Sequence, residues 1–174
     1  MLRGLRRSDD RGPVRADRWL HWWASSGAEV PLVYFDASAF VKLLVEESGT
    51  ELAVALWDGC DAAVSSRLAY PEVRAALATA YRNHDLDRDG LEQAEESWEE
   101  FWGATRPVEL TPAVGYQAGQ LARQLALRGA DAVHLASALA MSDHSLIVAV
   151  WDRRLHNGAL ASHLAVAPVT LDPP

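Results

Sequence analysis

Four acidic residues stand in apolar surroundings, where an unpaired charge would be costly. Asp36 and Asp152 each follow directly on a short apolar run, and Glu72 and Asp131 lie in segments with helical periodicity and apolar neighbours. A carboxylate that loses water on burial needs a cation or a hydrogen-bond network to compensate it. The four acids are therefore the candidates for a chemically active site.

The residue types predict which cation such a site would hold. Oxygen donors without Cys or His at ligand spacing favour a hard cation, Mg2+ or Mn2+, over zinc. A bound divalent cation would offset repulsion between the acids, activate a water molecule and neutralise charge on a phosphate ester. Ser38, two residues after Asp36, is a candidate either for a supporting hydrogen bond to a carboxylate or to a water on the metal, or for a plain helix cap.

Each acid also has a structural interpretation. Asp36 and Asp131 could cap helices, Glu72 could interact with a helix dipole from the first turn, and Asp152 could be a turn residue. Taken singly, each acid fits either interpretation. A purely structural role for all four is harder to reconcile with their shared placement near strand ends and helix starts.

The elements that must position these acids follow an α/β pattern. From residue 31 onward, short apolar runs alternate with helical periods, which is typical of βα units around a mostly parallel sheet flanked by helices. The pattern predicts strands at 32–35, 62–65, 108–110 and 146–151, and an edge strand at 166–171 that Pro168 weakens. It predicts helices at 38–46, 50–57, from about Pro71 to 81, at 87–102, at 112–127 with an end at Gly129, and at 131–141.

The predicted sheet brings the acids to one edge. Ligands of open parallel sheets bind at the carboxyl ends of the strands. Asp36 and Asp152 follow two predicted strands, and the helices that carry Glu72 and Asp131 should start near the same edge.

Length, composition and charge restrict the class of protein. The 174 residues suit one domain, and 49% hydrophobic with 23% charged residues is typical of a folded chain. The net charge is −8; residues 1–30 hold six Arg and four acids, so residues 31–174 carry −10. Such an acidic body argues against nucleic-acid binding through a broad basic surface. The negative charge is compatible with an enzyme that binds a phosphate group through metal ions.

The remaining sequence features concern location and the start of the chain. One cysteine, Cys60, and no run of about 18 apolar residues predict a cytoplasmic protein without a disulfide or a membrane span. Residues 1–30 form an Arg/Trp-rich N-terminal extension before a domain at 31–174. Trp19, Trp22 and Trp23 could line one face of a short helix, which either packs on the domain or binds a partner. An incorrectly assigned start is the third possibility.

Four motifs resemble those of a known family. In order and approximate spacing, Tyr34–Lys42, Ser66 with Glu72, Asp131–Ala138 and Val150–Leu155 are similar to the PIN-domain nucleases, most closely the VapC-type toxins of bacterial toxin–antitoxin pairs. The resemblance covers about residues 31–171, and Trp151 departs from it, since a small hydroxyl residue is frequent at that position.

The resemblance implies a single PIN-like domain and a function. It implies a Mg2+-dependent endoribonuclease that hydrolyses RNA phosphodiesters with metal-activated water, using Asp36, Glu72, Asp131 and Asp152 as catalytic residues and metal ligands. It also implies a homodimer and inhibition by a cognate VapB-like antitoxin. Arg153, directly after Asp152, is a candidate contact for an RNA phosphate or an antitoxin carboxylate.

Two other interpretations remain open from the sequence. One is a metal-dependent phosphohydrolase or a receiver-like domain phosphorylated on Asp36, although the paired acid and the later lysine of a receiver are missing. The other is a catalytically silent module whose acids bind a basic partner. His134 could be a general base, but its place within the Asp131 helix favours packing or support of another residue.

Overall fold

The computed structural model describes residues 32–141 and 145–171, so the N-terminal extension at 1–30 lies outside the described residues. The described chain contains a five-stranded sheet in which every pairing is parallel, which confirms the predicted α/β class. The strand order is β3-β2-β1-β4-β5. The strands are β1 (Leu32–Phe35), β2 (Ala62–Ser66), β3 (Arg106–Val108), β4 (Ile147–Ala149) and β5 (Ala165–Ala167).

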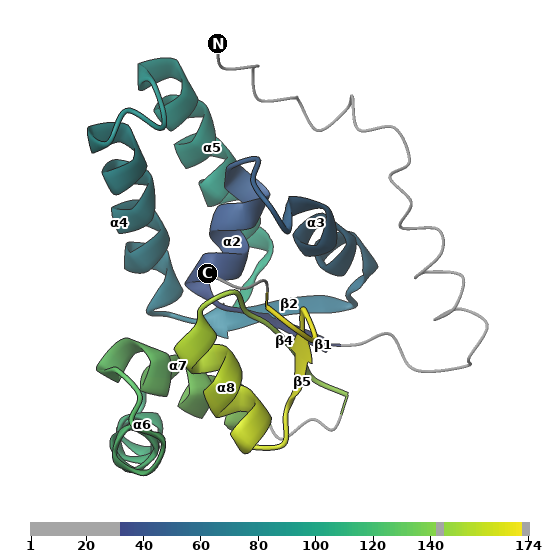
Figure 1. Cartoon of the computed structure of the whole chain (residues 1–174), viewed down its shortest axis with the longest axis vertical. Helices are drawn as coiled ribbons and strands as arrows, with labels where there is room; N and C mark the ends of the chain where they lie inside the picture. Colours follow the sequence, from purple (N-terminus) through teal and green to yellow (C-terminus); the bar gives the residue numbers. More distant parts are fainter. Residues whose placement is uncertain (1–31, 142–144, 172–174) are drawn as a thin grey trace, which may run out of the picture.

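Helices cover both faces of this sheet. In Figure 1, α2 to α5 lie on one side of the strands and α6 to α8 on the other. The helices are α2 (Ala37–Leu44), α3 (Thr50–Gly59), α4 (Ala69–Arg82), α5 (Arg88–Ala104), α6 (Pro112–Leu125), α7 (Gly129–Leu139) and α8 (Arg153–Ala161). None of the helices within residues 32–141 and 145–171 has the length and apolar character needed to cross a bilayer.

Strand β1 supplies side chains to both layers. Successive residues of a strand point to opposite faces. Val33 and Phe35 accordingly pack with α2 to α5, whereas Tyr34 packs with the opposite layer beside Leu135 of α7. All three side chains are buried, as expected for a strand covered on both faces.

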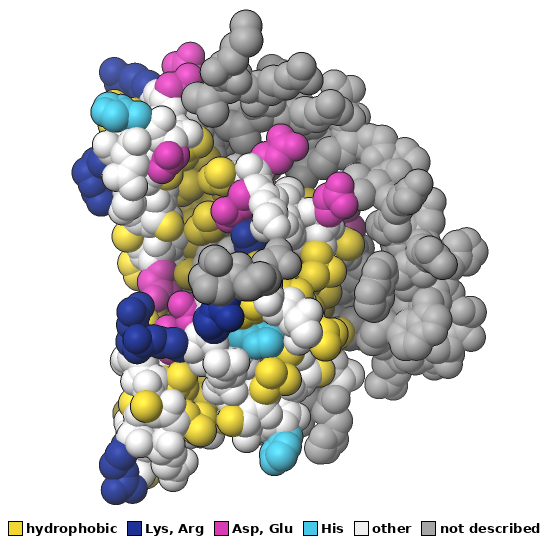
Figure 2. All heavy atoms as spheres, in the orientation of Figure 1, with side chains coloured by type: hydrophobic (Ala, Val, Ile, Leu, Met, Phe, Trp, Pro, Cys, Tyr) yellow, Lys and Arg dark blue, Asp and Glu magenta, His cyan; other side chains and the backbone are white. Residues whose placement is uncertain are grey.

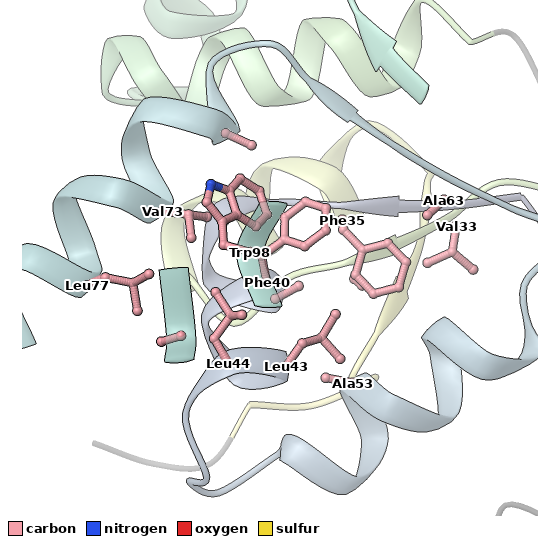
Figure 3. Close-up of a cluster of buried hydrophobic side chains, with 14 residues drawn as sticks. Val33, Phe35, Phe40, Leu43, Leu44, Ala53, Ala63, Val73, Leu77 and Trp98 are labelled. Atoms are coloured by element: carbon pink, nitrogen blue, oxygen red, sulfur yellow. The ribbon is translucent and has the colours of Figure 1, made fainter. Parts of the chain in front are cut away.

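The core on the α2–α5 side is built from aromatic rings. Figure 3 shows Phe35, Phe40 and Trp98 close together in this core. The ring centroids of Phe40 and Trp98 are 4.9 Å apart, and those of Phe35 and Phe40 are 5.5 Å apart. Edge and tilted contacts at this range are the favoured arrangements for aromatic pairs.

Two predicted boundaries were wrong around the turn between α6 and α7. The helix expected to reach residue 127 ends at Leu125, because Ala126 adopts a left-handed conformation (φ 52°) and stops it. Gly129 begins α7 instead of ending the previous helix. The difference brings Asp131 into the first turn of α7.

The second half also differs from prediction in its strands and its last helix. β3 lies at 106–108, where it pairs with Val64 to Ser66, and β5 stops before Pro168, which has no N–H to donate. Helix α8 was not predicted, because its sequence contains Gly158 and several polar residues. It forms with Leu155 and Ala159 on its buried side.

Candidate active site

The carboxyl ends of β1 and β4 lie side by side where the strand order reverses. From β1 the chain moves to β2 and β3 on one side of the sheet, and β4 and β5 are added on the other. Ligands of open α/β sheets bind outside such a switch point. Asp36 follows β1 directly, and Asp152 follows β4 after two residues, so the structure places both acids at this edge.

Asp36 is a buried N-cap. Its side chain accepts a hydrogen bond from the Ala39 N–H at 2.8 Å and another from the Ser38 hydroxyl at 2.7 Å. The residue is only 3% exposed. Burial raises the pKa of Asp36 to about 6, although the hydrogen bonds from Ser38 and Ala39 partly oppose the rise. At neutral pH, Asp36 therefore carries a poorly compensated negative charge.

Ser38 joins the two strand ends through one hydroxyl group. Its oxygen donates to Asp36 and accepts from the backbone N–H groups of Trp151 at 2.8 Å and Asp152 at 3.2 Å. The predicted hydrogen bond from Ser38 to a carboxylate is present. The same hydroxyl also fixes the Asp36 side chain relative to the backbone that carries Asp152.

Asp152 and Asp131 form the second half of the site. Asp152 caps α8, with Oδ1 accepting from the N–H groups of Arg154 at 2.8 Å and Leu155 at 3.0 Å. Asp131 accepts from the Arg128 N–H at 3.3 Å. Burial, followed by the negative charge of Asp152, raises the pKa of Asp131. The two carboxylates are thus close enough to repel each other while each also caps its helix.

Glu72 lies in the first turn of α4, with its side chain 29% exposed. Its Oε2 is 2.7 Å from Nε2 of His134, a buried residue of α7. Nδ1 of His134 is in turn 2.9 Å from the Tyr34 hydroxyl. Sequence reasoning favoured packing or support of another residue for His134, and it did not name Tyr34 as a candidate site residue. The available signal for Tyr34 was its place in a buried strand, because a buried tyrosine hydroxyl needs a partner.

The four acids do not converge on one point. Within the described residues, no group of three or more Asp, Glu, His or Cys side chains is arranged to hold a metal ion. Asp36 interacts with the Asp152 backbone through Ser38, Asp131 interacts with Asp152 by charge, and Glu72 interacts with His134. Figure 2 shows acidic side chains with basic ones beside them at the level between the two helical layers.

The donor chemistry and the electrostatics nevertheless fit a divalent cation. Burial raises the pKa of Asp36 and of Asp131, and the charge of Asp152 adds to the rise at Asp131, so a bound cation would stabilise the ionised carboxylates. Mg2+ commonly uses one or two carboxylates and fills its other positions with water and substrate phosphate, so a closed cage is not required. Asp36, Asp131 and Asp152 suit this role, while one oxygen of Glu72 is occupied by His134.

Comparison with known proteins decides the family. The model of the PIN domain matches residues 33–157, which is more than half of the chain. The chain belongs to the PIN-domain family. It is 72% identical over 144 residues to two Mycobacterium tuberculosis proteins, ribonuclease VapC45 of strain CDC 1551 / Oshkosh and ribonuclease VapC49 of strain H37Rv. Each alignment covers 83% of this chain and 100% of the relative, which confirms the resemblance to VapC-type PIN domains.

Solved structures confirm the PIN-domain fold. A toxin–antitoxin complex from Klebsiella pneumoniae matches with a TM-score of 0.57 and 15% identity, covering 80% of this chain and 99% of that one. VapBC2 from Rickettsia felis, bound to a DNA fragment from its promoter, matches with a TM-score of 0.56 and 10% identity. That match covers 78% of this PIN-domain chain and 96% of the other.

Proposed function

We propose that this PIN-domain chain is a metal-dependent endoribonuclease and the toxin of a toxin–antitoxin pair. The observation that carries the proposal is the set of carboxylates at the switch point of the sheet, where burial raises the pKa of Asp36 and of Asp131 and the charge of Asp152 adds to the rise at Asp131. The 72% identity to proteins named ribonucleases supports RNA as the substrate.

The residues of the site have distinct parts in this proposal. Asp36, Asp131 and Asp152, with Glu72 at the edge, would hold Mg2+ or Mn2+. When bound, the cation would activate water and neutralise charge on the scissile phosphodiester. Asp36 and Asp152 keep fixed orientations because each also caps a helix. Arg153, exposed at the start of α8, would contact an RNA phosphate or an antitoxin carboxylate.

The partners follow from the same relatives. Two of the similar structures are titled as a toxin–antitoxin complex and as VapBC2, which supports a VapB-like antitoxin as the inhibitor of this chain. We further propose a cytoplasmic homodimer. Sedimentation of the purified chain with and without a candidate VapB-like antitoxin would test both interactions.

RNA cleavage tests the activity directly. A mixed RNA pool would be incubated with the protein and Mg2+ or Mn2+, with EDTA, and with Asp131→Asn. The matched control is Asp61→Asn, which changes an exposed acid just before β2, at the opposite end of the strands. We expect metal-dependent cleavage that EDTA and Asp131→Asn abolish and that Asp61→Asn retains.

Other outcomes identify the alternatives. Cleavage that survives EDTA or Asp131→Asn would contradict the assignment of these carboxylates. A folded protein that binds Mn2+ but cuts no RNA in the pool would favour a silent binding module. Release of phosphate from a monoester, without RNA cleavage, would favour a phosphohydrolase.

A further inference from the structure

A hydrogen-bonded series of groups connects the two helical layers beneath the site. It runs from the Ser66 N–H to the Tyr34 hydroxyl at 3.0 Å, on to His134 Nδ1 at 2.9 Å, and from His134 Nε2 to Glu72 at 2.7 Å. These groups come from β2, β1, α7 and α4. Tyr34 and His134 are buried, whereas Glu72 is partly exposed at the edge of the sheet.

The contacts favour one arrangement of the protons. The Tyr34 oxygen accepts from the Ser66 N–H, so its single proton is available to His134 Nδ1. Burial raises the pKa of Tyr34, which keeps that proton on the hydroxyl. With Nδ1 accepting, Nε2 is the nitrogen that carries a proton, and it faces the Glu72 carboxylate.

Glu72 has little else to orient it. The N-cap residue of its helix, Leu68, provides no side-chain cap, and the backbone hydrogen bond from Glu72 to Leu68 is long, at 3.4 Å. A glutamate with three rotatable bonds samples many orientations unless a partner holds it. Within the described residues, the Glu72 carboxylate is hydrogen-bonded to the buried imidazole of His134.

We propose that His134 is a positioning residue, which fixes the Glu72 carboxylate through Nε2–H while the Tyr34 hydroxyl fixes the imidazole ring. The proposal rests on the function proposed above, because Glu72 matters only if the site works on a substrate. It assigns to Tyr34 and His134 a role in the geometry of the site and none in contact with RNA. Groups that hold a ligand in this way typically change metal affinity or activity about 10–100-fold when removed.

The first test reads the metal-free full-length chain by NMR. In long-range 1H–15N spectra, His134 should show the tautomer protonated at Nε2, with a slowly exchanging proton that shifts in Glu72→Gln. A proton on Nδ1 alone, or a proton on Nε2 in rapid exchange with water, would overturn the proposal. This measurement needs neither cleavage nor metal, so its failure is distinct from failure of the proposed nuclease activity.

The second test uses two substitutions of similar size. The amide of His134→Gln reaches close to the position of Nε2 and can still donate to Glu72, whereas His134→Asn is too short. We expect His134→Asn to weaken Mn2+ binding and lower kcat about 10–100-fold, with little change in KM for RNA, and His134→Gln to recover a large part of both. Equal losses in the two variants would overturn the positioning role.

A second buried histidine provides the control. His156 of α8 is buried and contacts the Pro168 carbonyl through Nε2 at 2.9 Å. Unfolding in urea would be measured for His134→Asn and His156→Asn alongside Mn2+ affinity. We expect both to lose stability and only His134→Asn to lose Mn2+ affinity; loss of affinity in proportion to stability in both would show a structural effect alone.

Discussion

The two faces of the sheet are packed with different kinds of side chain. On the α2–α5 side, rings occupy the space: Phe40 packs against Trp98 at 4.9 Å and Trp57 against Phe101 at 4.8 Å between centroids. On the α6–α8 side, Val and Leu residues pack against the sheet, and alanines lie where α6 meets α7, with Ala132 and Ala136 of α7 packing against α6. Rings fill the gap between widely spaced elements, whereas alanines allow helices to approach closely.

This difference matters for the site because each layer supplies two of the four acids. Asp36 and Glu72 are carried by α2 and α4 on the α2–α5 side, which we call the aromatic side. Asp131 and Asp152 are carried by α7 and α8 on the α6–α8 side, which we call the alanine side. The spacing between the two pairs therefore depends on both packings. Substitutions that remove side-chain volume should destabilise the aromatic side, and substitutions that add side-chain volume should destabilise the alanine side.

The largest effect is expected from emptying the aromatic side. Trp98→Ala should lower the free energy of unfolding by about 3–5 kcal/mol, because a fully buried ring is lost and leaves a cavity. Urea denaturation would measure it. Tyr116→Ala, which removes an aromatic residue 73% exposed on α6, should change stability by about 0.5 kcal/mol or less. Similar losses in the two variants would refute a ring-dependent core.

The next largest effect is a pH dependence of stability, which should be stronger for Asp36 than for Asp131. The pKa of Asp36 is about 6 in the folded protein against an ordinary 3.8, so the native state binds this proton more tightly. Stability of the metal-free protein should therefore fall as pH rises from about 4 through 6. Asp36→Asn retains a capping oxygen and should be more stable than wild type at pH 7.5, by at most about 3 kcal/mol, and similar at pH 4.

Asp131→Asn is the matched variant on the alanine side. Because Asp131 is less buried, its raised pKa should make the metal-free variant only slightly more stable at neutral pH. Thermal melting with EDTA at both pH values would compare the two substitutions. A destabilised Asp36→Asn at pH 7.5 would mean that its hydrogen bonds outweigh the cost of burying the charge.

A smaller effect is expected from overfilling the alanine side. Ala136 is completely buried between α6 and α7, and Ala136→Leu should cost about 1–3 kcal/mol through overpacking. Ala113→Leu makes the same change at an exposed position of α6 and is the control. Equilibrium urea titrations of both would decide the point. Tolerance of leucine at position 136 would show that the helices are not held at close range.

The smallest effect is expected from two glycine substitutions on the alanine side. Gly119 lies in α6 with open space around it, so Gly119→Ala should stabilise by about 0.5–1 kcal/mol. At Gly158 of α8 an added Cβ would lie 3.2 Å from two carbons of Leu127 and 3.4 Å from one of Leu135. Gly158→Ala should therefore raise the melting temperature less than Gly119→Ala does. An equal rise would mean that α8 can shift away from Leu127 and Leu135.

Local patterns in the sequence were sufficient for most of the elements and for the placement of Asp36 and Asp152. An apolar run of strand length followed by an acid is a local signal, and the parallel sheet brings such strand ends to one edge. The caps at Asp36 and Asp131 are equally local, because each involves residues three positions apart. Helix α8 was missed because its apolar stripe is short and includes Gly158.

Only the tertiary structure decided which groups meet. Tyr34 and His134 are 100 residues apart in the chain, and Ser38 and Trp151 are 113 apart, yet each pair is joined by one hydrogen bond. Periodicity along the chain cannot specify such contacts, since they depend on how closely α7 and the strand ends pack. The sequence by itself thus determined the types of the acids and the edge where two of them lie, while packing of the two layers determined what orients each one.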